Sequence, residues 1–190
     1  MSETPPRIAP LEPPFDDELG ALLERMTPPD APDALALFRV LARNPKLAER
    51  LMSTGGHFLG KHSTLPIRDR EIVIDRVSAR CGNEYEWGVH VAAFARAANL
   101  SEADVRHTVS YPADPEAWAP NEAALIAMVD ALHDTSTLDD EEWAALRAHY
   151  DEAQVLELLM LAGWYHAIAF VCNAARVPLE AWQARLPHRL

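Results

Sequence analysis

The residues best suited to chemistry lie between positions 70 and 90. Asn83, Glu86 and His90 are spaced by three and then four residues, so on a helix their side chains project from one face. A carboxylate beside an imidazole supplies a general acid or base near neutral pH, because the carboxylate orients the ring and raises its proton affinity. The spacing predicts His90 as the acid or base and Glu86 as its orienting neighbour.

A second carboxylate, Glu71, precedes this group by one helix. It reaches the same pocket if two helices pack antiparallel across the turn at Cys81 and Gly82. We therefore predict His90, Glu86 and Glu71 as catalytic residues. A Glu-His pair four residues apart is also common on solvated helix faces, so the pair alone does not define a site.

Neighbouring residues favour a pocket around this pair. Tyr85 and Trp87 stand beside two glutamates, and aromatic rings in such a position are typical of the rim of a partly buried pocket. An anionic substrate needs a cation, for which Arg70, Arg76 and Arg80 are candidates. The substrate-binding residues predicted from the sequence are Tyr85, Trp87, Asn83, Cys81 and Arg80.

From residue 33 onward the apolar residues have helical spacing, and no segment shows the alternation of apolar and polar residues that is typical of a half-buried strand. Helices must therefore position the candidate residues. The Asn44-Pro45 step ends or bends one helix, and Gly55-Gly56 is expected to interrupt the next. Ser101-x-x-Asp104 is a capping-box pattern. The expected helices span residues 16–26, 35–41, 47–58, 67–81, 83–98, 121–133, 139–149 and 151–176, with a short helix that opens at Ser101 and precedes a loop over 111–120.

The domain organisation follows from the distribution of proline. Eight of the 15 prolines lie in residues 1–32, which predicts an extended N-terminal arm with one short helix. Residues 33–190 are predicted to form a single all-helical domain, because the expected loops are short. An arm of this kind often wraps a neighbouring surface.

Composition narrows the class of protein. The chain has 190 residues, 49% of them apolar, and a formal net charge of -12, which argues against nucleic acid or a membrane surface as the main partner. The apolar run 156–172 contains Glu157 and His166, so a buried helix is the better interpretation. Two cysteines make no disulfide framework and no secretory signal is visible, so we expect a cytoplasmic protein.

The chain resembles the carboxymuconolactone decarboxylase and alkylhydroperoxidase D-like family. The redox branch of that family has a glutamate and, twelve positions later, a Cys-x-x-Cys-x-x-x-His signature. Here Glu71 is followed twelve positions later by Asn83-x-x-Glu86-x-x-x-His90, so glutamate and histidine match and both cysteines are replaced. Non-redox members carry a pattern like Glu84 to His90. The resemblance covers roughly residues 35–175 and includes 41–45, 65–71, 98–101 and 131–135.

The resemblance implies an all-α fold, the alkylhydroperoxidase D-like helical bundle, assembled as a homodimer, trimer or hexamer with pockets near subunit contacts. It also implies a small-molecule substrate. Peroxide reduction needs an attacking thiolate and a resolving thiol, and neither asparagine nor glutamate supplies one. The lyase branch needs no metal or organic cofactor, so none is expected.

Three functions stay open at this point. The first is a cofactor-independent lyase or isomerase that uses Glu71, Glu86 and His90 on a small carboxylated or lactone substrate. The second is a non-catalytic oligomeric family member in which the same residues form a buried polar network. The third is peroxidase activity through Cys81. A metal site is not expected, because Glu86 and His90 offer only two ligands. The remaining histidines expected at the surface are His107, His133, His149 and His188.

Overall fold

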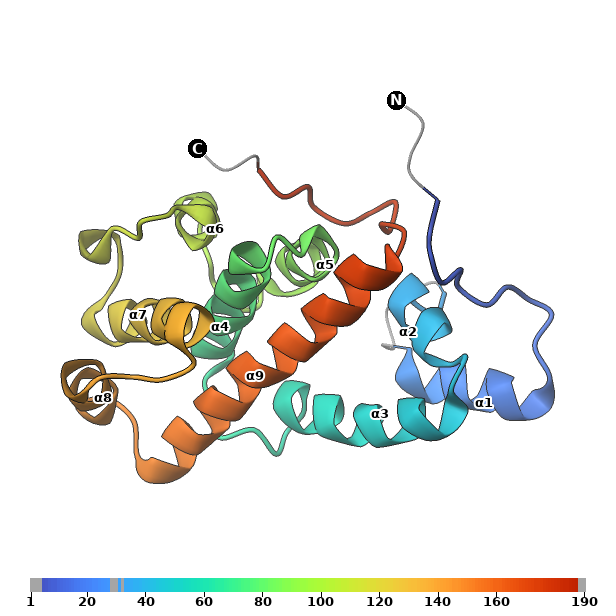
Figure 1. The fold of residues 1–190 in the computed structure, drawn as a ribbon, viewed down its shortest axis with the longest axis horizontal. Helices are drawn as coiled ribbons and strands as arrows, with labels where there is room; N and C mark the ends of the chain where they lie inside the picture. The colour runs from blue at the N-terminus through green and yellow to red at the C-terminus, as the bar shows by residue number, and fades with distance from the viewer. Residues whose placement is uncertain (1–4, 28–30, 32, 188–190) are drawn as a thin grey trace. The chain divides into compact units, whose positions relative to one another are not determined.

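The described part of the chain is helical, as the sequence predicts. A computed structural model describes residues 5–27, 31 and 33–187, and no β-strand occurs in these ranges. Positions 1–4, 28–30 and 32 of the predicted arm lie outside the described residues. The helices are shown in Figure 1 and span α1 Asp17–Met26, α2 Ala36–Leu41, α3 Pro45–Leu59, α4 Ile67–Arg80, α5 Glu84–Phe94, α6 Glu102–Val109, α7 Pro120–Thr135, α8 Asp140–Arg147 and α9 Glu152–Ala175, with a 3-10 turn at Pro115–Ala117.

One compact unit comprises residues 1–63 and 170–181, so residues 33–63 group with the N-terminal segment. Here α1, α2 and α3 pack against one another. Asn44 caps α3, because its side chain accepts a hydrogen bond from the Leu47 amide. The expected interruption at Gly55-Gly56 is wrong: α3 runs through both glycines, since a helix tolerates glycine at a cost of about 1 kcal/mol each.

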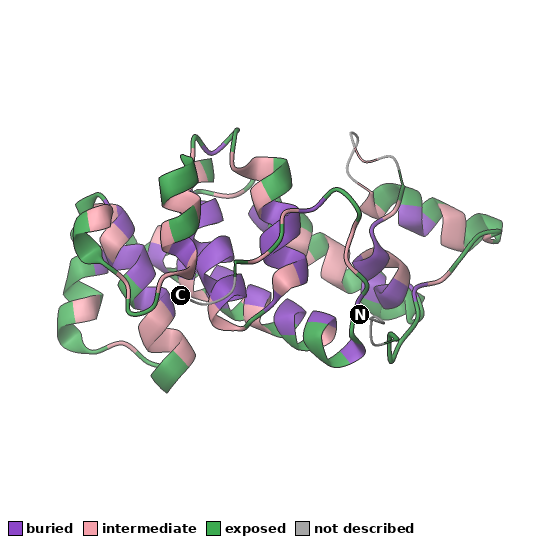
Figure 2. Cartoon of the chain, turned by 90° about the horizontal axis from the view of Figure 1, so that it is seen from above, coloured by how far each residue is buried: buried purple, intermediate pink, exposed green. Residues whose placement is uncertain are grey.

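The other unit comprises residues 64–169 and 182–190, and α4 lies at its centre. This helix packs against α5, α6 and α7. All its residues from Asp69 to Ala79 are buried, the class that Figure 2 draws in purple. Ile72, Val73, Ile74 and Val77 have no exposed surface. Because α4 is surrounded, its charged residues are buried as well, and each one needs a partner.

Arg76 shows how such a charge is accommodated. Its side chain is fully buried and binds Asp130 of α7 through two nitrogens, at 2.8 and 2.5 Å. The same guanidinium donates to the carbonyl oxygens of Thr108 and Ser110 at 3.0 and 2.6 Å. A planar, bidentate donor suits this arrangement, and it fixes α4 against α7 and the end of α6.

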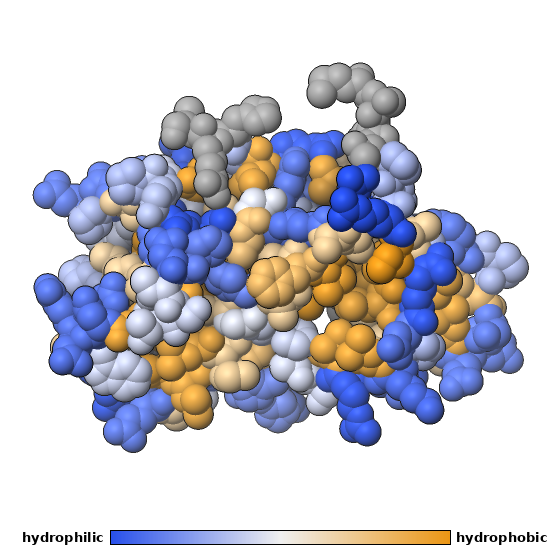
Figure 3. Space-filling view, viewed as in Figure 1, coloured by the Kyte–Doolittle hydropathy of each residue, from blue (hydrophilic) through white to orange (hydrophobic). Residues whose placement is uncertain are grey.

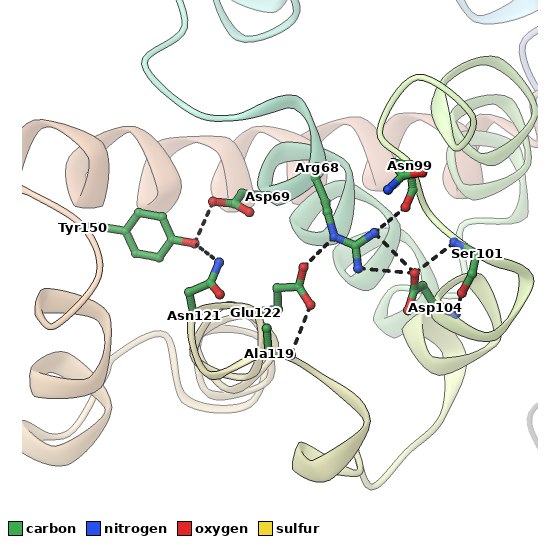
Figure 4. A network of polar contacts seen from close by, with 9 residues as sticks. All are labelled: Arg68, Asp69, Asn99, Ser101, Asp104, Ala119, Asn121, Glu122 and Tyr150. Carbon is green, nitrogen blue, oxygen red and sulfur yellow. Dashed lines mark hydrogen bonds and ion pairs between the residues drawn. The ribbon is translucent and has the colours of Figure 1, made fainter.

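The start of α4 is held by a second polar network (Figure 4). Arg68 donates to Glu122 of α7 at 2.5 Å and to Asp104 of α6 at 3.2 Å. Tyr150 donates to Asp69 at 2.8 Å. Asp104 also completes the capping box with Ser101 that the sequence predicts. These contacts set the axial position of α4, and with it the position of Glu71.

The turn between α4 and α5 needs a glycine. Gly82 has φ +60°, a left-handed conformation that residues with a Cβ rarely adopt. Asn83 follows as the N-cap of α5, where its Oδ1 accepts from the Glu86 amide at 3.3 Å. The two helices therefore run antiparallel across this turn.

Helix α9 is the longest of the helices described. By length and composition alone it is apolar enough to cross a membrane, with a mean hydropathy of 1.7 over its most apolar window. Half of that window is buried inside the protein, as in the core helix of a globular protein.

Candidate functional site

Two carboxylates and an imidazole meet between α4 and α5. His90 Nδ1 lies 2.7 Å from Glu71 Oε2, and His90 Nε2 lies 3.5 Å from Glu86 Oε2. The sequence-based expectation that Glu71 reaches the Glu86–His90 pair across the turn agrees with this geometry. Since a charged carboxylate only accepts hydrogen bonds, His90 donates through Nδ1 and directs Nε2 away from Glu71.

Further side chains complete the surroundings of His90. Arg70 binds the other oxygen of Glu71, with Nε at 2.8 Å and Nη2 at 2.7 Å. From α9, Tyr165 Oη lies 3.0 Å from His90 Nε2. The half-buried Phe94 ring stacks at 5.2 Å from the His90 ring and 5.7 Å from the Arg70 guanidinium carbon. Both oxygens of Glu71 and both nitrogens of His90 are thus engaged.

Burial and charge shift the protonation of this group. Burial lowers the pKa of His90, but the charge and hydrogen bond of Glu71, together with the charges of Glu86 and Asp75, outweigh burial, so the pKa of His90 is raised. Burial raises the pKa of Glu86, against the opposing effect of His90. Burial also raises the pKa of Tyr165 well above its usual value. The arrangement therefore favours a protonated imidazole held by Glu71 and a carboxyl at Glu86 that binds its proton more tightly than usual.

Asp75 adds a third carboxyl, one helical turn after Glu71. It is 1% exposed, and neither of its oxygens has a hydrogen-bond partner among the described residues. Burial, and then the charge of Glu71, raises the pKa of Asp75 well above its usual value. Burial without a hydrogen-bond partner disfavours the charged form of the Asp75 carboxyl.

The site is enclosed within this chain. Glu71 is 1% exposed, His90 4% and Glu86 6%. The segment after Ala181 covers part of α5: Gln183 donates to the Glu84 carbonyl at 2.9 Å, and the Ala184 amide donates to the Gly88 carbonyl at 3.0 Å. A Cβ at position 88 would overlap the Ala184 carbonyl oxygen, so glycine permits this close approach.

The structure places the two predicted aromatic residues in the core. Tyr85 is 3% and Trp87 2% exposed, and the Trp87 indole donates to Thr108 Oγ1 at 3.1 Å. The expectation that they form the rim of a partly buried pocket is therefore wrong. The Trp87 ring can be buried because its indole nitrogen finds a partner inside the protein. Asn83 is also buried and serves as the cap of α5 described above.

Arg80 and Cys81 lie at the end of α4 and are engaged elsewhere. Arg80 forms ion pairs with Asp134 at 2.5 Å and Asp130 at 3.6 Å, and its guanidinium stacks on the Tyr111 ring at 3.8 Å. Cys81 Sγ lies 3.9 Å from His133 Nδ1. Of the three candidate arginines, Arg70 is the one that contacts Glu71.

Sequence reasoning missed two members of the site, Tyr165 and Asp75. Tyr165 is 75 residues from His90 in sequence, and no local spacing connects them. Asp75 stands four residues after Glu71, but it belongs to a helix with many charged residues, so the sequence gives no local signal of its burial. His133, expected at the surface, is half-buried; His149 is exposed as expected, His107 is half-buried, and His188 lies outside the described residues.

The fold is that of alkylhydroperoxidase D-like helical proteins. Similar solved structures include an uncharacterized peroxidase-related protein from Silicibacter sp. TM1040, with a TM-score of 0.77 and 15% identity over 94% of this chain and 95% of that one. Another, the alkylhydroperoxidase AhpD core of Ralstonia eutropha JMP134, has a TM-score of 0.75 and 17% identity over 92% and 93%. At these identities the likeness concerns the fold.

Sequence comparison supports the resemblance to this family. The model of the carboxymuconolactone decarboxylase family matches residues 45–130, which contain Glu71, Glu86 and His90. The debrominase Bmp8, solved with 2,3,4-tribromopyrrole, has the same fold, with a TM-score of 0.75 and 16% identity over 92% of this chain and 91% of that one. No curated protein matches this sequence.

Proposed function

We propose that this protein is a cofactor-independent lyase or isomerase that moves one proton on a small carboxylated or lactone substrate. The observation that carries the proposal is the buried His90, held at Nδ1 by Glu71 at 2.7 Å and facing Tyr165 and Glu86 with Nε2. A histidine fixed on one nitrogen by a carboxylate presents the other nitrogen for proton transfer.

The charge of the centre supports an anionic substrate. Arg70 lies beside His90, whose pKa is raised, while burial raises the pKa of Glu86 and of Asp75 and so disfavours their negative charge. In a decarboxylation, the carbon–carboxylate bond breaks, and its electron pair moves onto a conjugated carbonyl. Carbon dioxide leaves, and an acid must then deliver a proton to carbon. His90 Nε2–H, with Glu86 beside it, is the proposed acid, and solvent restores its proton.

The test is turnover of carboxylated lactones by the untagged protein, followed as carbon dioxide release. We expect His90→Gln to reduce turnover by about 100-fold or more, because general acid catalysis contributes roughly 10²–10⁴-fold. Tyr165→Phe should retain more activity than His90→Gln. His149→Ala, an exposed histidine, is the matched control. Unchanged turnover in His90→Gln, with the fold intact by circular dichroism, would contradict the proposal.

A peroxidase mechanism through Cys81 is less well supported. Burial raises the pKa of the Cys81 thiol to about 11, with Arg80 opposing it, whereas attack on a peroxide needs a thiolate. The family's two cysteine positions hold Asn83 and Glu86. Peroxide consumption that is lost in Cys81→Ser and kept in Cys172→Ser would favour this alternative over the lyase.

The enclosure of the site favours a non-catalytic role as the second candidate. Groups as buried as Glu71 and His90 also serve as a polar network that fixes helix packing. Under this role, His90→Gln would lower stability or change the oligomeric state, and no substrate of the class above would be turned over.

Self-association is part of the proposal. Leu156 and Met160, one turn apart on α9, are 64% and 56% exposed, and Figure 3 shows apolar side chains on the face that α9 crosses. An exposed apolar stripe of this kind is typical of an interface. Leu156→Glu with Met160→Glu should reduce the mass measured by analytical ultracentrifugation, whereas Trp143→Glu on α8 should not. We also propose a cytoplasmic location. The formal net charge of -12 supports a protein whose partners include neither nucleic acid nor a membrane surface.

A further inference from the structure

A second cluster of chemistry-bearing side chains gathers at the end of α4. Cys81, His133 of α7 and His166 of α9 each offer one ligand atom, and these three atoms lie within 4.8 Å of one another. His133 Nδ1 lies 3.0 Å from His166 Nε2, and Cys81 Sγ lies 3.9 Å from His133 Nδ1. All three side chains are half-buried. Two imidazoles and one thiol are the donor set that zinc prefers.

We propose that Cys81, His133 and His166 form a binding site for a divalent transition metal ion, with Zn²⁺ as the expected occupant. Tetrahedral Zn²⁺ with ordinary bond lengths separates two imidazole nitrogens by about 3.3 Å and a nitrogen from a sulfur by about 3.5 Å. The observed separations of 3.0 and 3.9 Å differ from these by a few tenths of an ångström. The third pair, Cys81 and His166, lies within 4.8 Å, and metal binding draws the thiol toward the two histidines.

The orientation of His166 is already fixed for this role. Its Nδ1 lies 2.9 Å from the Ala162 carbonyl oxygen, which can only accept, so Nδ1 carries the proton and Nε2 carries the lone pair. A second hydrogen bond of this kind holds most metal-binding histidines in the correct tautomer. His166 therefore presents Nε2 toward His133 as a ligand atom.

The protonation of the other two ligands must change on binding. His133 Nδ1 lies 3.0 Å from the lone pair of His166 Nε2, so Nδ1 carries the proton in the free protein, and this proton moves to Nε2 when the metal binds Nδ1. The Cys81 thiol loses its proton to solvent. The neighbouring cation Arg80 is balanced by Asp134 at 2.5 Å and Asp130 at 3.6 Å, so it does not oppose a metal ion as an isolated charge would.

Three protein ligands leave one position of a tetrahedral ion for water or another small ligand. The site is independent of the proposed lyase function, because it uses none of Glu71, Glu86 and His90. A failure of one proposal therefore leaves the other unaffected.

The test is Zn²⁺ binding by the untagged, chelator-treated protein, measured by competition with a chromophoric chelator. We expect one Zn²⁺ per chain. Removing a residue that only hydrogen-bonds to a metal ligand weakens metal affinity by roughly 10–100-fold. Cys81→Ser and His166→Ala each remove a ligand itself, so each should weaken Zn²⁺ binding by at least this factor. The matched controls are Cys172→Ser, which removes the other thiol, and His149→Ala, an exposed histidine.

Cobalt gives an independent readout. Co²⁺ bound to a thiolate gives a sulfur-to-metal charge-transfer band, so the wild type should show this band and Cys81→Ser should not. Circular dichroism confirms that each variant is folded. The proposal is overturned if the wild type binds substantially less than one Zn²⁺, if the cobalt band is absent, or if the control variants weaken binding as much as Cys81→Ser does.

Discussion

Replacing Glu71 by glutamine tests the central ion pair most directly. An amide has one oxygen and one NH2 group, so in Glu71→Gln the new side chain can accept from Arg70 or from His90 but not from both. If its oxygen faces Arg70, its NH2 group faces His90 Nδ1, which must then become an acceptor. His90 would be neutral with its proton on Nε2, whereas the wild type favours the protonated ring.

The size of the effect follows from the distances. Each of the two oxygens of Glu71 lies 2.7 Å from one cationic nitrogen, Oε2 from His90 Nδ1 and Oε1 from Arg70 Nη2, and each contact gains about 6 kcal/mol at an effective dielectric constant of about 20. Desolvation of buried ions offsets much of this gain, so removal of one partner costs about 3–5 kcal/mol. We expect the free energy of unfolding of Glu71→Gln to fall by that amount at pH 5.5.

The pH dependence separates this pair from ordinary packing. The pKa of His90 is raised in the folded state. The stability that protonated His90 contributes is therefore fully present below its unfolded-state pKa of about 6.5, and it is lost as pH rises through the folded-state pKa. A double-mutant cycle with Glu71→Gln and His90→Gln, followed by urea unfolding, should give a coupling energy at pH 5.5 that exceeds the value at pH 9.5 by about 1 kcal/mol or more.

The exposed pair Arg25–Glu49 serves as the control cycle. Its atoms lie 3.4 Å apart, and both side chains are more than half exposed, so its coupling should stay below about 1 kcal/mol. A Glu71–His90 coupling as small as this control, or equal at the two pH values, would refute the electrostatic reasoning.

Three more variants test the packing around the site. Arg76→Lys cannot keep the contacts to Asp130, Thr108 and Ser110, so the free energy of unfolding should fall by about 3 kcal/mol; an unchanged urea midpoint would count against it. Gly88→Ala places a Cβ where it overlaps the Ala184 carbonyl oxygen, so we expect a loss of about 1–3 kcal/mol and faster amide hydrogen exchange in residues 182–187. The pKa of Asp75 is raised in the folded protein, so the wild type loses stability as pH rises above the unfolded-state pKa of about 3.9. Asp75→Asn removes this carboxyl, so the variant should gain stability relative to wild type between pH 4 and pH 8. Thermal unfolding at both pH values checks this.

The helices could be predicted because their signals are local. The spacing of apolar residues, the Ser101–Asp104 capping box and the Asn44-Pro45 step lie within a few residues of the structure they determine. The antiparallel turn at Gly82 was equally local, and it brought Glu71 to His90. Gly55-Gly56 misled the prediction, since a weak helix former inside a helix loses to the packing of the whole element.

The remaining part of the site depends on tertiary contacts that no spacing reveals. Tyr165 reaches His90, and His166 reaches His133, only because α9 lies beside α5 and α7. The burial of Trp87 depends on Thr108, which belongs to another helix. Charged residues on α4 resemble a solvated face in the sequence, and their burial becomes visible only when α5, α6 and α7 surround them.

The environment of α5 fits the presence of Asn83 and Glu86 at the two positions where the redox branch of the family has cysteines. The start of a helix can stabilise a thiolate through its amide groups, but here Asn83 caps that end by accepting from the Glu86 amide. The burial that would raise the pKa of a thiol at position 86 raises the pKa of the glutamate instead. A buried position that disfavours negative charge is unsuitable for a nucleophilic thiolate and suitable for a neutral acid. Glu86 beside a protonated His90 therefore indicates proton transfer rather than thiol redox chemistry as the reaction to test first.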